Sequence, residues 1–316
     1  MGVLRKTFET VDFGDGRDGH WAARIRMLWP RAEKALAPEA FTPEGAASAR
    51  RLFCRHMPEL VPALDMLSWQ AGVPNGQTFL TLAALRPFLA GCTQIGGPGV
   101  LLRNYDFDPA EVEGLIVRSN LLRPVIGTQD GGWGLLDGMN DAGLAVSLTF
   151  GGRIAQGPGF AIIIVLRYLL ETCDTVDQAL ARLASIPVGV PQNVTLADRR
   201  QAVTVYTGPD IAMLRAPDAC AANHQHFPVP ADQERNTRTT ERIMAIRSSG
   251  PSVAAMLRPP LYSVDYDGAL GTVYTACYRP EAGQVTYYWP GRRWELSFGR
   301  FYPEVRTMPL GLVSNP

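Results

Sequence analysis

The stretch GCTQIGGPGVLLRNYDF, residues 91–107, contains two β-prone runs separated by a Gly/Pro-rich turn, which predicts a β-hairpin. If the turn is centred on residues 97–98, Cys92 faces Arg103 on the same side of the hairpin. A guanidinium beside a thiol lowers the pKa of the thiol and supplies fixed donors. Asp106 lies where the second strand should end. The pattern therefore favours a nucleophilic cysteine with two charged neighbours.

Two other interpretations of the hairpin stay open at this point. A bulge would shift the register by one residue and place Cys92 and Arg103 on opposite faces. Arg103 and Asp106 would also fit a surface ion pair that contributes little. The other cysteines, Cys54, Cys173, Cys220 and Cys277, are best explained as structural thiols.

The chain changes character at this hairpin. Residues 42–57 have a Thr cap followed by Pro, and residues 74–89 repeat apolar residues at helical spacing, so the first ninety residues are predicted to be mostly helical. After the hairpin, short β-prone runs predict antiparallel strands at 99–107, 114–119, 143–150, 192–198, 201–208, 272–278, 284–290 and 294–299.

Two helical segments interrupt these strands, at residues 159–183, with a break at 174–175, and at residues 237–246. Strands, then helices, then strands predict an α+β protein whose sheets carry helices on one face. The Gly-rich segment 127–134, GTQDGGWG, lacks the Lys-Ser/Thr of a phosphate-binding loop and is predicted to be a turn.

Composition excludes several classes of protein. The 316 residues are 46% hydrophobic, and thirty Lys plus Arg balance thirty Asp plus Glu, so neither a nucleic-acid partner nor a membrane span is expected. The longest apolar run, residues 160–170, is interrupted by Arg167 and is shorter than the ~20 residues of a span. The N-terminal residues do not resemble a signal peptide, so a cytoplasmic location is expected. Five cysteines without CxxC spacing argue against disulfides and zinc knuckles.

Three fragments together carry a family resemblance: GCTQI at 91–95, RNYDF at 103–107 and DGMNDAGLAVS at 137–147. They resemble the acyl-CoA:isopenicillin N acyltransferase type of N-terminal nucleophile (Ntn) hydrolase, a relative of choloylglycine hydrolases and acid ceramidases. The likeness covers most of the chain, and the Cys with the Arg-Asn-aromatic-Asp-Phe run is its most specific motif. It implies a four-layer αββα sandwich of two antiparallel sheets flanked by helices.

The resemblance also implies self-cleavage between Gly91 and Cys92. Residues 1–91 would become a small, mostly helical chain that stays packed against the catalytic core, residues 92–316, as one compact unit. Gly91 lacks a Cβ and so allows strain and close approach. The freed α-amino group has a reference pKa near 7.7 to 8.0, against ~10.4 for Lys, and would serve as the base.

Roles for individual side chains follow from the same likeness. Cys92 would be the nucleophile, Arg103 would contact the acyl or carboxylate region of the substrate, and Asp106 would orient the new amino terminus. Asn193, in PQNVTLAD, matches an oxyanion-hole donor.

Two further positions are assigned to substrate binding. Choloylglycine hydrolases have an Asn after the strand that matches residues 143–150, whereas this chain has Thr149. Arg238 matches a distal arginine of the family.

The implied function is amide-bond hydrolysis or acyl transfer through a Cys92 acyl-enzyme. The substrate would be a small acylated amine or amino acid, with acyl-CoA as a second candidate, and a homo-oligomer is compatible with this interpretation. No cofactor or metal is expected. The alternatives are an uncleaved, non-catalytic relative that binds a ligand in the same pocket, and an unrelated cysteine enzyme that uses His224. His224 and His226 share strand-like spacing but have no third zinc ligand, so a turn position explains them better.

Overall fold

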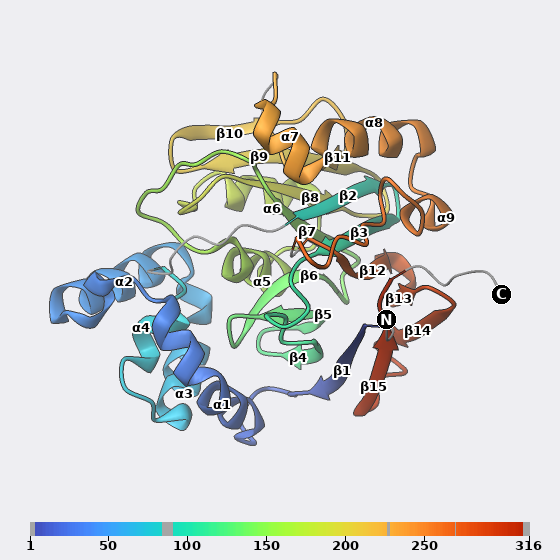
Figure 1. Ribbon diagram of the computed structural model, residues 1–316. Helices are drawn as coiled ribbons and strands as arrows, with labels where there is room; N and C mark the ends of the chain where they lie inside the picture. Colours follow the sequence, from blue (N-terminus) through green and yellow to red (C-terminus); the bar gives the residue numbers. More distant parts are fainter. Residues whose placement is uncertain (1–3, 84–90, 226–227, 269, 312–316) are drawn as a thin grey trace.

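The computed structural model describes residues 4–83, 91–225, 228–268 and 270–311, and their strands form two sheets (Figure 1). The larger sheet has nine strands in the order β10-β9-β8-β7-β6-β5-β4-β1-β15, and the smaller has six in the order β11-β2-β3-β12-β13-β14. Every neighbouring pair among them is antiparallel except β1 and β4, which are parallel.

The strands of the larger sheet are β1 (Arg5–Asp12), β4 (Leu115–Asn120), β5 (Pro124–Asp130), β6 (Gly134–Asn140), β7 (Ala145–Phe150), β8 (Gln192–Ala197), β9 (Ala202–Gly208), β10 (Ile211–Arg215) and β15 (Glu304–Pro309). Those of the smaller sheet are β2 (Gly91–Gly97), β3 (Val100–Asp106), β11 (Cys220–Ala221), β12 (Thr272–Arg279), β13 (Gln284–Trp289) and β14 (Arg292–Ser297). The helices are α1 (His20–Ala35), α2 (Pro43–His56), α3 (Val61–Ala71), α4 (Gly76–Leu80), α5 (Ile162–Thr172), α6 (Val176–Leu183), α7 (Ala231–Thr237), α8 (Thr239–Ser249) and α9 (Val253–Met256).

The two sheets pack face to face, with helices on both outer faces. β2 and β3 contact β7 and β8 across the interface between the sheets. α5 covers β5 to β7 and α6 covers β8, whereas α8 lies on β2 and β11 and α9 lies on β3. The four-layer αββα arrangement is therefore confirmed. Strands β6 and β8 are buried along their whole length because each lies between a helix and the other sheet.

The predicted strands are all present, but the sequence missed β1, β5, β6, β10, β11 and β15. Segment 127–134 is only partly the turn that we expected, because its first four residues complete β5. The turn itself is at Gly131 and Gly132, both with positive φ. β5 and β6 were not predicted because β5 ends in polar residues and β6 contains glycines, and both kinds of residue are uncommon in β-prone runs.

The helical predictions are largely confirmed. Thr42 caps α2 by accepting from the Gly45 amide, with Pro43 at the first turn. The apolar run forms the buried helix α5, and the break before α6 lies where we expected it. The last predicted helix corresponds mainly to α8. Part of the predicted helix at 74–89 lies outside the described residues.

The N-terminal residues contribute both helices and a strand. α1 to α4 gather at one side of the molecule, drawn in blue and cyan in Figure 1. They are tied to the larger sheet through the Trp21 indole, which donates to Gly132 O at 2.7 Å, and the Trp133 indole, which donates to Leu80 O at 2.7 Å. β1 was not predicted, because a single eight-residue run with only two fully buried positions gives a weak alternation.

Candidate active site

The β2–β3 hairpin is present, but its register differs from our prediction by two residues. Gly97 pairs with Val100, so Pro98 and Gly99 form the turn, and Cys92 pairs with Tyr105 instead of Arg103. Proline presets the first turn position, and Gly99 takes a φ of 73° at the second, which favours this turn over one centred on residues 97–98. A shift of two preserves the faces, so Cys92 and Arg103 still lie on the same side.

Arg103 lies diagonally opposite Cys92 and contacts its sulfur. Both side chains face the larger sheet and are fully buried, and Arg103 Nη2 donates to Cys92 Sγ at 3.3 Å. Arg103 Nη1 donates to Asp137 Oδ2 at 2.8 Å and to the Leu136 carbonyl. The guanidinium also lies over the Tyr105 ring, 4.9 Å from its centroid. The thiol therefore has a fixed cationic donor beside it.

Asp137 anchors this arginine from the larger sheet. Its carboxylate also accepts from Thr128 Oγ1 at 2.9 Å, from Tyr274 OH at 2.6 Å and from Tyr278 OH. Asp137 is fully buried, and its donors come from both sheets. A buried ion pair with this many additional hydrogen bonds is held in one geometry.

Burial raises the pKa of the Cys92 thiol, although Arg103 acts in the opposite direction. Arg103 lowers the pKa of the thiol as we expected, but in the uncleaved chain the effect of burial is larger and the pKa is raised. The reason is that the side chain has no exposed surface, so loss of hydration of the thiolate outweighs its attraction to the guanidinium.

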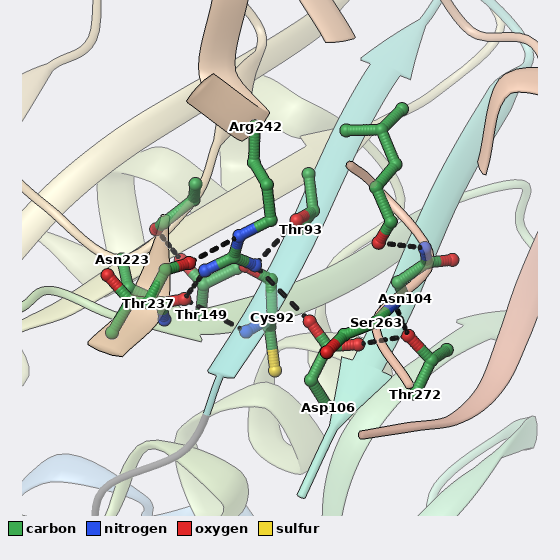
Figure 2. A network of polar contacts seen from close by, with 12 residues as sticks. Cys92, Thr93, Asn104, Asp106, Thr149, Asn223, Thr237, Arg242, Ser263 and Thr272 are labelled. Carbon is green, nitrogen blue, oxygen red and sulfur yellow. Dashed lines mark hydrogen bonds and ion pairs between the residues drawn. The ribbon is translucent and has the colours of Figure 1, made fainter. Parts of the chain in front are cut away.

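The opposite face of the hairpin meets α8 through Arg242, which sequence reasoning missed. Arg242 Nη1 donates to the Cys92 carbonyl and to Thr93 Oγ1, both at 2.8 Å. Its Nη1 also lies 3.2 Å from Asp106 Oδ2. Figure 2 shows the guanidinium above Cys92, with the sulfur pointing away from it.

Asp106 lies beside the Gly91-Cys92 peptide, because it pairs with Gly91 across the hairpin. Its other carboxylate oxygen accepts from Thr272 Oγ1 at 2.7 Å. Burial raises the pKa of Asp106, with Arg242 and Thr272 acting against this shift. A Cβ at Gly91 would lie 3.2 Å from Asp106 Cβ, so the close approach that we expected at this glycine is present. The strained backbone expected there stays a prediction.

Asn223 is the second residue that sequence reasoning missed. The backbone N–H of Cys92 donates to Asn223 Oδ1 at 3.0 Å, and Arg242 Nη2 donates to the same oxygen at 2.5 Å (Figure 2). The Asn223 backbone N–H in turn donates to Thr239 Oγ1 at 2.7 Å. The amide nitrogen of the peptide that would be cleaved is therefore held by a side-chain amide.

Asn193 and Thr149 pair with each other on the neighbouring strands β8 and β7, next to the segment that carries Asn223. Asn193 Nδ2 donates to Thr149 Oγ1 at 2.9 Å and to the Ala222 carbonyl at 2.8 Å. Thr149 Oγ1 donates to the same carbonyl at 2.7 Å. The two predicted residues thus support the segment that carries Asn223. Their predicted catalytic and binding roles stay predictions.

Arg238 and the two histidines are the other predicted polar residues. Arg238 is exposed and forms an ion pair with Glu241 at 2.7 Å, so its predicted substrate contact stays a prediction. His224 Nδ1 lies 2.8 Å from Thr239 Oγ1, and burial lowers the pKa of His224 to about 4. His226 lies outside the described residues, and within those described no cluster of His, Cys, Asp or Glu could hold a metal.

A helical pattern could have identified Arg242. In α8 the buried positions are Thr239, Arg242, Ile243 and Ile246, the spacing of an inward-facing stripe. Arg242 is one turn beyond Arg238 and belongs to this stripe, whereas Arg238 does not. Asn223 follows the two-residue strand β11, and no local pattern marks it.

Two cavities adjoin the hairpin. The smaller, about 180 Å³, is lined by Gly91, Asp106 and Arg242, and the larger, about 910 Å³, is lined by Asn223 and Phe107. Both are also lined by Leu270, so they lie next to each other. None of the helices in the described parts of the chain is long and apolar enough to cross a membrane.

Solved structures that resemble this chain include the following three. A mutant of the conjugated bile acid hydrolase from Clostridium perfringens has a TM-score of 0.43 at 13% identity, covering 72% of this chain and 99% of that chain. Penicillin V acylase from Agrobacterium tumefaciens has a TM-score of 0.42 at 13% identity, covering 70% and 92%. The Caenorhabditis elegans ortholog of N-acylethanolamine-hydrolyzing acid amidase has a TM-score of 0.46 at 15% identity, covering 69% and 100%.

A search of curated proteins found no match. Comparison with family models found one that matches residues 92–294 and therefore begins at the cysteine of the hairpin. This match covers more than half of the chain, and it agrees with the resemblance carried by the hairpin residues. The chain therefore belongs to the acyl-coenzyme A:6-aminopenicillanic acid acyl-transferase family.

Proposed function

We propose that this chain cleaves itself between Gly91 and Cys92 and then acts as a cysteine amidohydrolase or acyltransferase on a small N-acylated substrate. One observation carries the proposal: all three polar atoms of Cys92 are held. Arg103 contacts its sulfur, Asn223 accepts from its nitrogen, and Arg242 donates to its oxygen. A merely structural thiol does not require such contacts.

In the self-cleavage step, Cys92 Sγ attacks the Gly91 carbonyl carbon. The new C–S bond replaces the C–N bond, and the thiol proton moves to the Cys92 nitrogen, which leaves as an amine. Water then hydrolyses the thioester, which regenerates the thiol and leaves a carboxylate on Gly91. Asn223 supports this step by fixing the amide that must leave.

In the second reaction, the freed α-amino group takes the thiol proton while sulfur attacks the substrate carbonyl. The same amine then donates that proton to the departing nitrogen, and water or a second amine resolves the acyl-enzyme. Arg242 disfavours protonation of the nearby α-amine, since like charges repel, and so keeps it available as a base. Arg103, which donates to the sulfur, stays beside it in this step.

Intact-mass measurement and denaturing electrophoresis of freshly purified protein test the cleavage. Two fragments of about 10 and 25 kDa are expected, from a 34.5 kDa chain divided after residue 91. The Cys92→Ala protein should stay whole, and Cys92→Ser should process slowly because a hydroxyl is the weaker nucleophile. A single full-length species in wild type that hydrolyses or transfers no acyl group would instead favour the uncleaved ligand-binding alternative.

A further inference from the structure

Strand β12 carries two tyrosines that reach across the space between the sheets to Asp137. Ala276 of this strand pairs with Arg103, and Tyr274 and Tyr278 lie two residues on either side of Ala276. Side chains two residues apart in a strand share a face, so both phenols lie on the face that carries Arg103, with the small side chain of Ala276 between them. This spacing brings two hydroxyls and one guanidinium to a single carboxylate on the larger sheet.

These donors fill the carboxylate of Asp137. Its Oδ2 accepts from Arg103 Nη1 at 2.8 Å and from Tyr274 OH at 2.6 Å. Its Oδ1 accepts from Thr128 Oγ1 at 2.9 Å and from Tyr278 OH. A carboxylate has about four lone-pair sites, so the four donors occupy all of them. Arg103 therefore holds one site, and hydroxyls hold the other three.

Arg103 divides its two terminal nitrogens between different partners. Nη1 donates to Asp137 and to the Leu136 carbonyl, whereas Nη2 donates to Cys92 Sγ at 3.3 Å. An arginine and a carboxylate that meet without competitors commonly form two parallel hydrogen bonds, which here would take Nη2 away from the sulfur. Arg103 Nε is buried and has no hydrogen-bond partner among the described residues. No bond at Nε therefore opposes a rotation of the guanidinium toward Asp137.

We propose that Tyr274 is a positioning residue for Cys92: its hydroxyl occupies a lone pair of Asp137 Oδ2, which restricts Arg103 to one bond with this carboxylate and leaves Nη2 for the sulfur. Tyr278 acts in the same way from Oδ1, but more weakly, because Arg103 does not bond to that oxygen. The proposal rests on the proposed function of Cys92. It assigns no substrate contact to either tyrosine.

Tyr274→Phe removes only the hydroxyl and leaves Asp137 Oδ2 short of one donor in a fully buried site. An unsatisfied buried acceptor is unfavourable, so Arg103 should turn and bind Asp137 through both Nη1 and Nη2. A crystal structure of the variant should show Nη2 within hydrogen-bond distance of Asp137 and no longer of Cys92 Sγ. A guanidinium that stays on the sulfur overturns the proposal, whatever the activity of the variant.

The pH profile of self-cleavage is the second readout. The hydrogen bond from Arg103 lowers the pKa of the Cys92 thiol, so its loss should move the acidic limb of the profile to higher pH. Tyr274→Phe should cleave about tenfold more slowly below the thiol pKa and approach the wild-type rate above it. Tyr278→Phe should shift the limb less, in the same direction, and decides the matter if Tyr274→Phe does not fold. A uniform fall in rate at every pH would limit the tyrosines to a structural role and overturn the proposal.

Other ionisable groups near Cys92 and Arg103 are common to the wild type and to both variants. They are Asp106, Asp130, Tyr105, Tyr287 and Arg242. Burial raises the pKa of Asp106 and of Asp130, and these carboxyls titrate alike in all three proteins. Burial also raises the pKa of Tyr274 and Tyr278 well above the ordinary value, so both hydroxyls keep their protons and stay donors across the profile.

Tyr287→Phe is the matched control. Tyr287 lies on the neighbouring strand β13 and is fully buried like Tyr274, but its hydroxyl lies 3.0 Å from Thr128 Oγ1 and 2.9 Å from Tyr278 OH rather than on Asp137. Its loss should leave Arg103 on the sulfur and the acidic limb in place. Equal limb shifts in Tyr274→Phe and Tyr287→Phe overturn the positioning role even if self-cleavage stands. If the wild type does not cleave itself, the proposed function fails, and the crystal structures of the two variants still decide this proposal.

Discussion

Cys92 is placed by backbone pairing and then held by three side chains, one from the same hairpin and two from distant parts of the chain. Arg103 comes from the partner strand, Asn223 from the segment after β11, and Arg242 from α8. The sulfur faces the larger sheet, whereas the backbone N–H and C=O of Cys92 point sideways within the smaller sheet, where Asn223 and Arg242 contact them. Each contact can therefore be tested separately.

Arg103→Lys is expected to slow self-cleavage and to move the acidic limb of its pH profile to higher pH. Arg103 lowers the pKa of the thiol first through its charge, which lysine keeps, and then through its hydrogen bond to sulfur. Loss of the planar fork removes that hydrogen bond, so the thiol pKa rises and less thiolate is present at a given pH. The measurement is the cleavage rate from pH 5 to 10.

Arg167→Lys is the control for Arg103→Lys. Arg167 is also fully buried and lies 3.2 Å from Glu171 within α5. Both variants should lose about 1 to 3 kcal/mol of unfolding free energy, since buried partners are left unsatisfied. Only Arg103→Lys should shift the pH profile; equal profiles would limit Arg103 to a structural role.

Asn223→Ala is expected to slow self-cleavage by on the order of 100-fold, because the Cys92 N–H loses the acceptor that positions the leaving amide. Asn193→Ala should act more weakly, because its N–H groups already support residue 222. Asn140→Ala is the control, since Asn140 is buried and its amide donates to Leu170 O, outside the site. A fall as large in a folded Asn193→Ala would instead support the direct role predicted for Asn193.

The β2–β3 hairpin depends on its two-residue turn. The register that places Arg103 diagonally from Cys92 requires the chain to reverse at Pro98 and Gly99. Gly99 has a φ of 73°, and a Cβ at this residue would meet no atom within 4 Å, so only the backbone conformation restricts the residue type. A substitution of Gly99 by alanine therefore measures the free-energy cost of the positive φ without a steric clash of the new side chain.

Gly99→Ala should therefore lower the free energy of unfolding by about 1 to 2 kcal/mol. Gly299→Ala is the matched control, because a Cβ there also meets nothing within 4 Å and no positive φ is required. It should be neutral or slightly stabilising, since alanine reduces the freedom of the unfolded chain. Urea titrations of both variants measure the difference; equal midpoints would contradict the turn assignment.

The N-terminal residues are part of the larger sheet as well as of the helical side of the molecule. β1 pairs with β15, near the other end of the chain, and with β4 (Figure 1). Cleavage after residue 91 would leave these pairings intact. The small chain would therefore still contribute strand β1 to a sheet whose other strands belong to the large chain.

Processed protein is accordingly expected to elute from gel filtration as one species that contains both fragments. The fragments should separate only when denaturant disrupts the sheet, because β1 and the Trp21 and Trp133 contacts bind the two parts over a buried core. The fractions are checked by denaturing electrophoresis. Fragments that separate in native buffer would show that residues 1–91 are a removable leader.

Local patterns determined much of this protein. The β-prone runs, the break between α5 and α6, and the cap at Thr42 were predictable, because strand alternation, helix caps and turn residues act over a few positions. The predicted register was wrong by two residues, but a shift of two keeps each side chain on the same face, so Cys92 and Arg103 were correctly placed on one side of the hairpin. The nucleophile candidate could thus be identified from the chain alone.

Only the tertiary structure brought Asn223, Arg242 and Asp137 to this hairpin. They lie far from Cys92 in sequence, and no local period records which distant side chain packs against a strand. It also decided the direction of the thiol pKa shift, since burial depends on all the layers that cover Cys92. β1 joined the sheet for the same reason: its partners β4 and β15 become neighbours only when the chain folds.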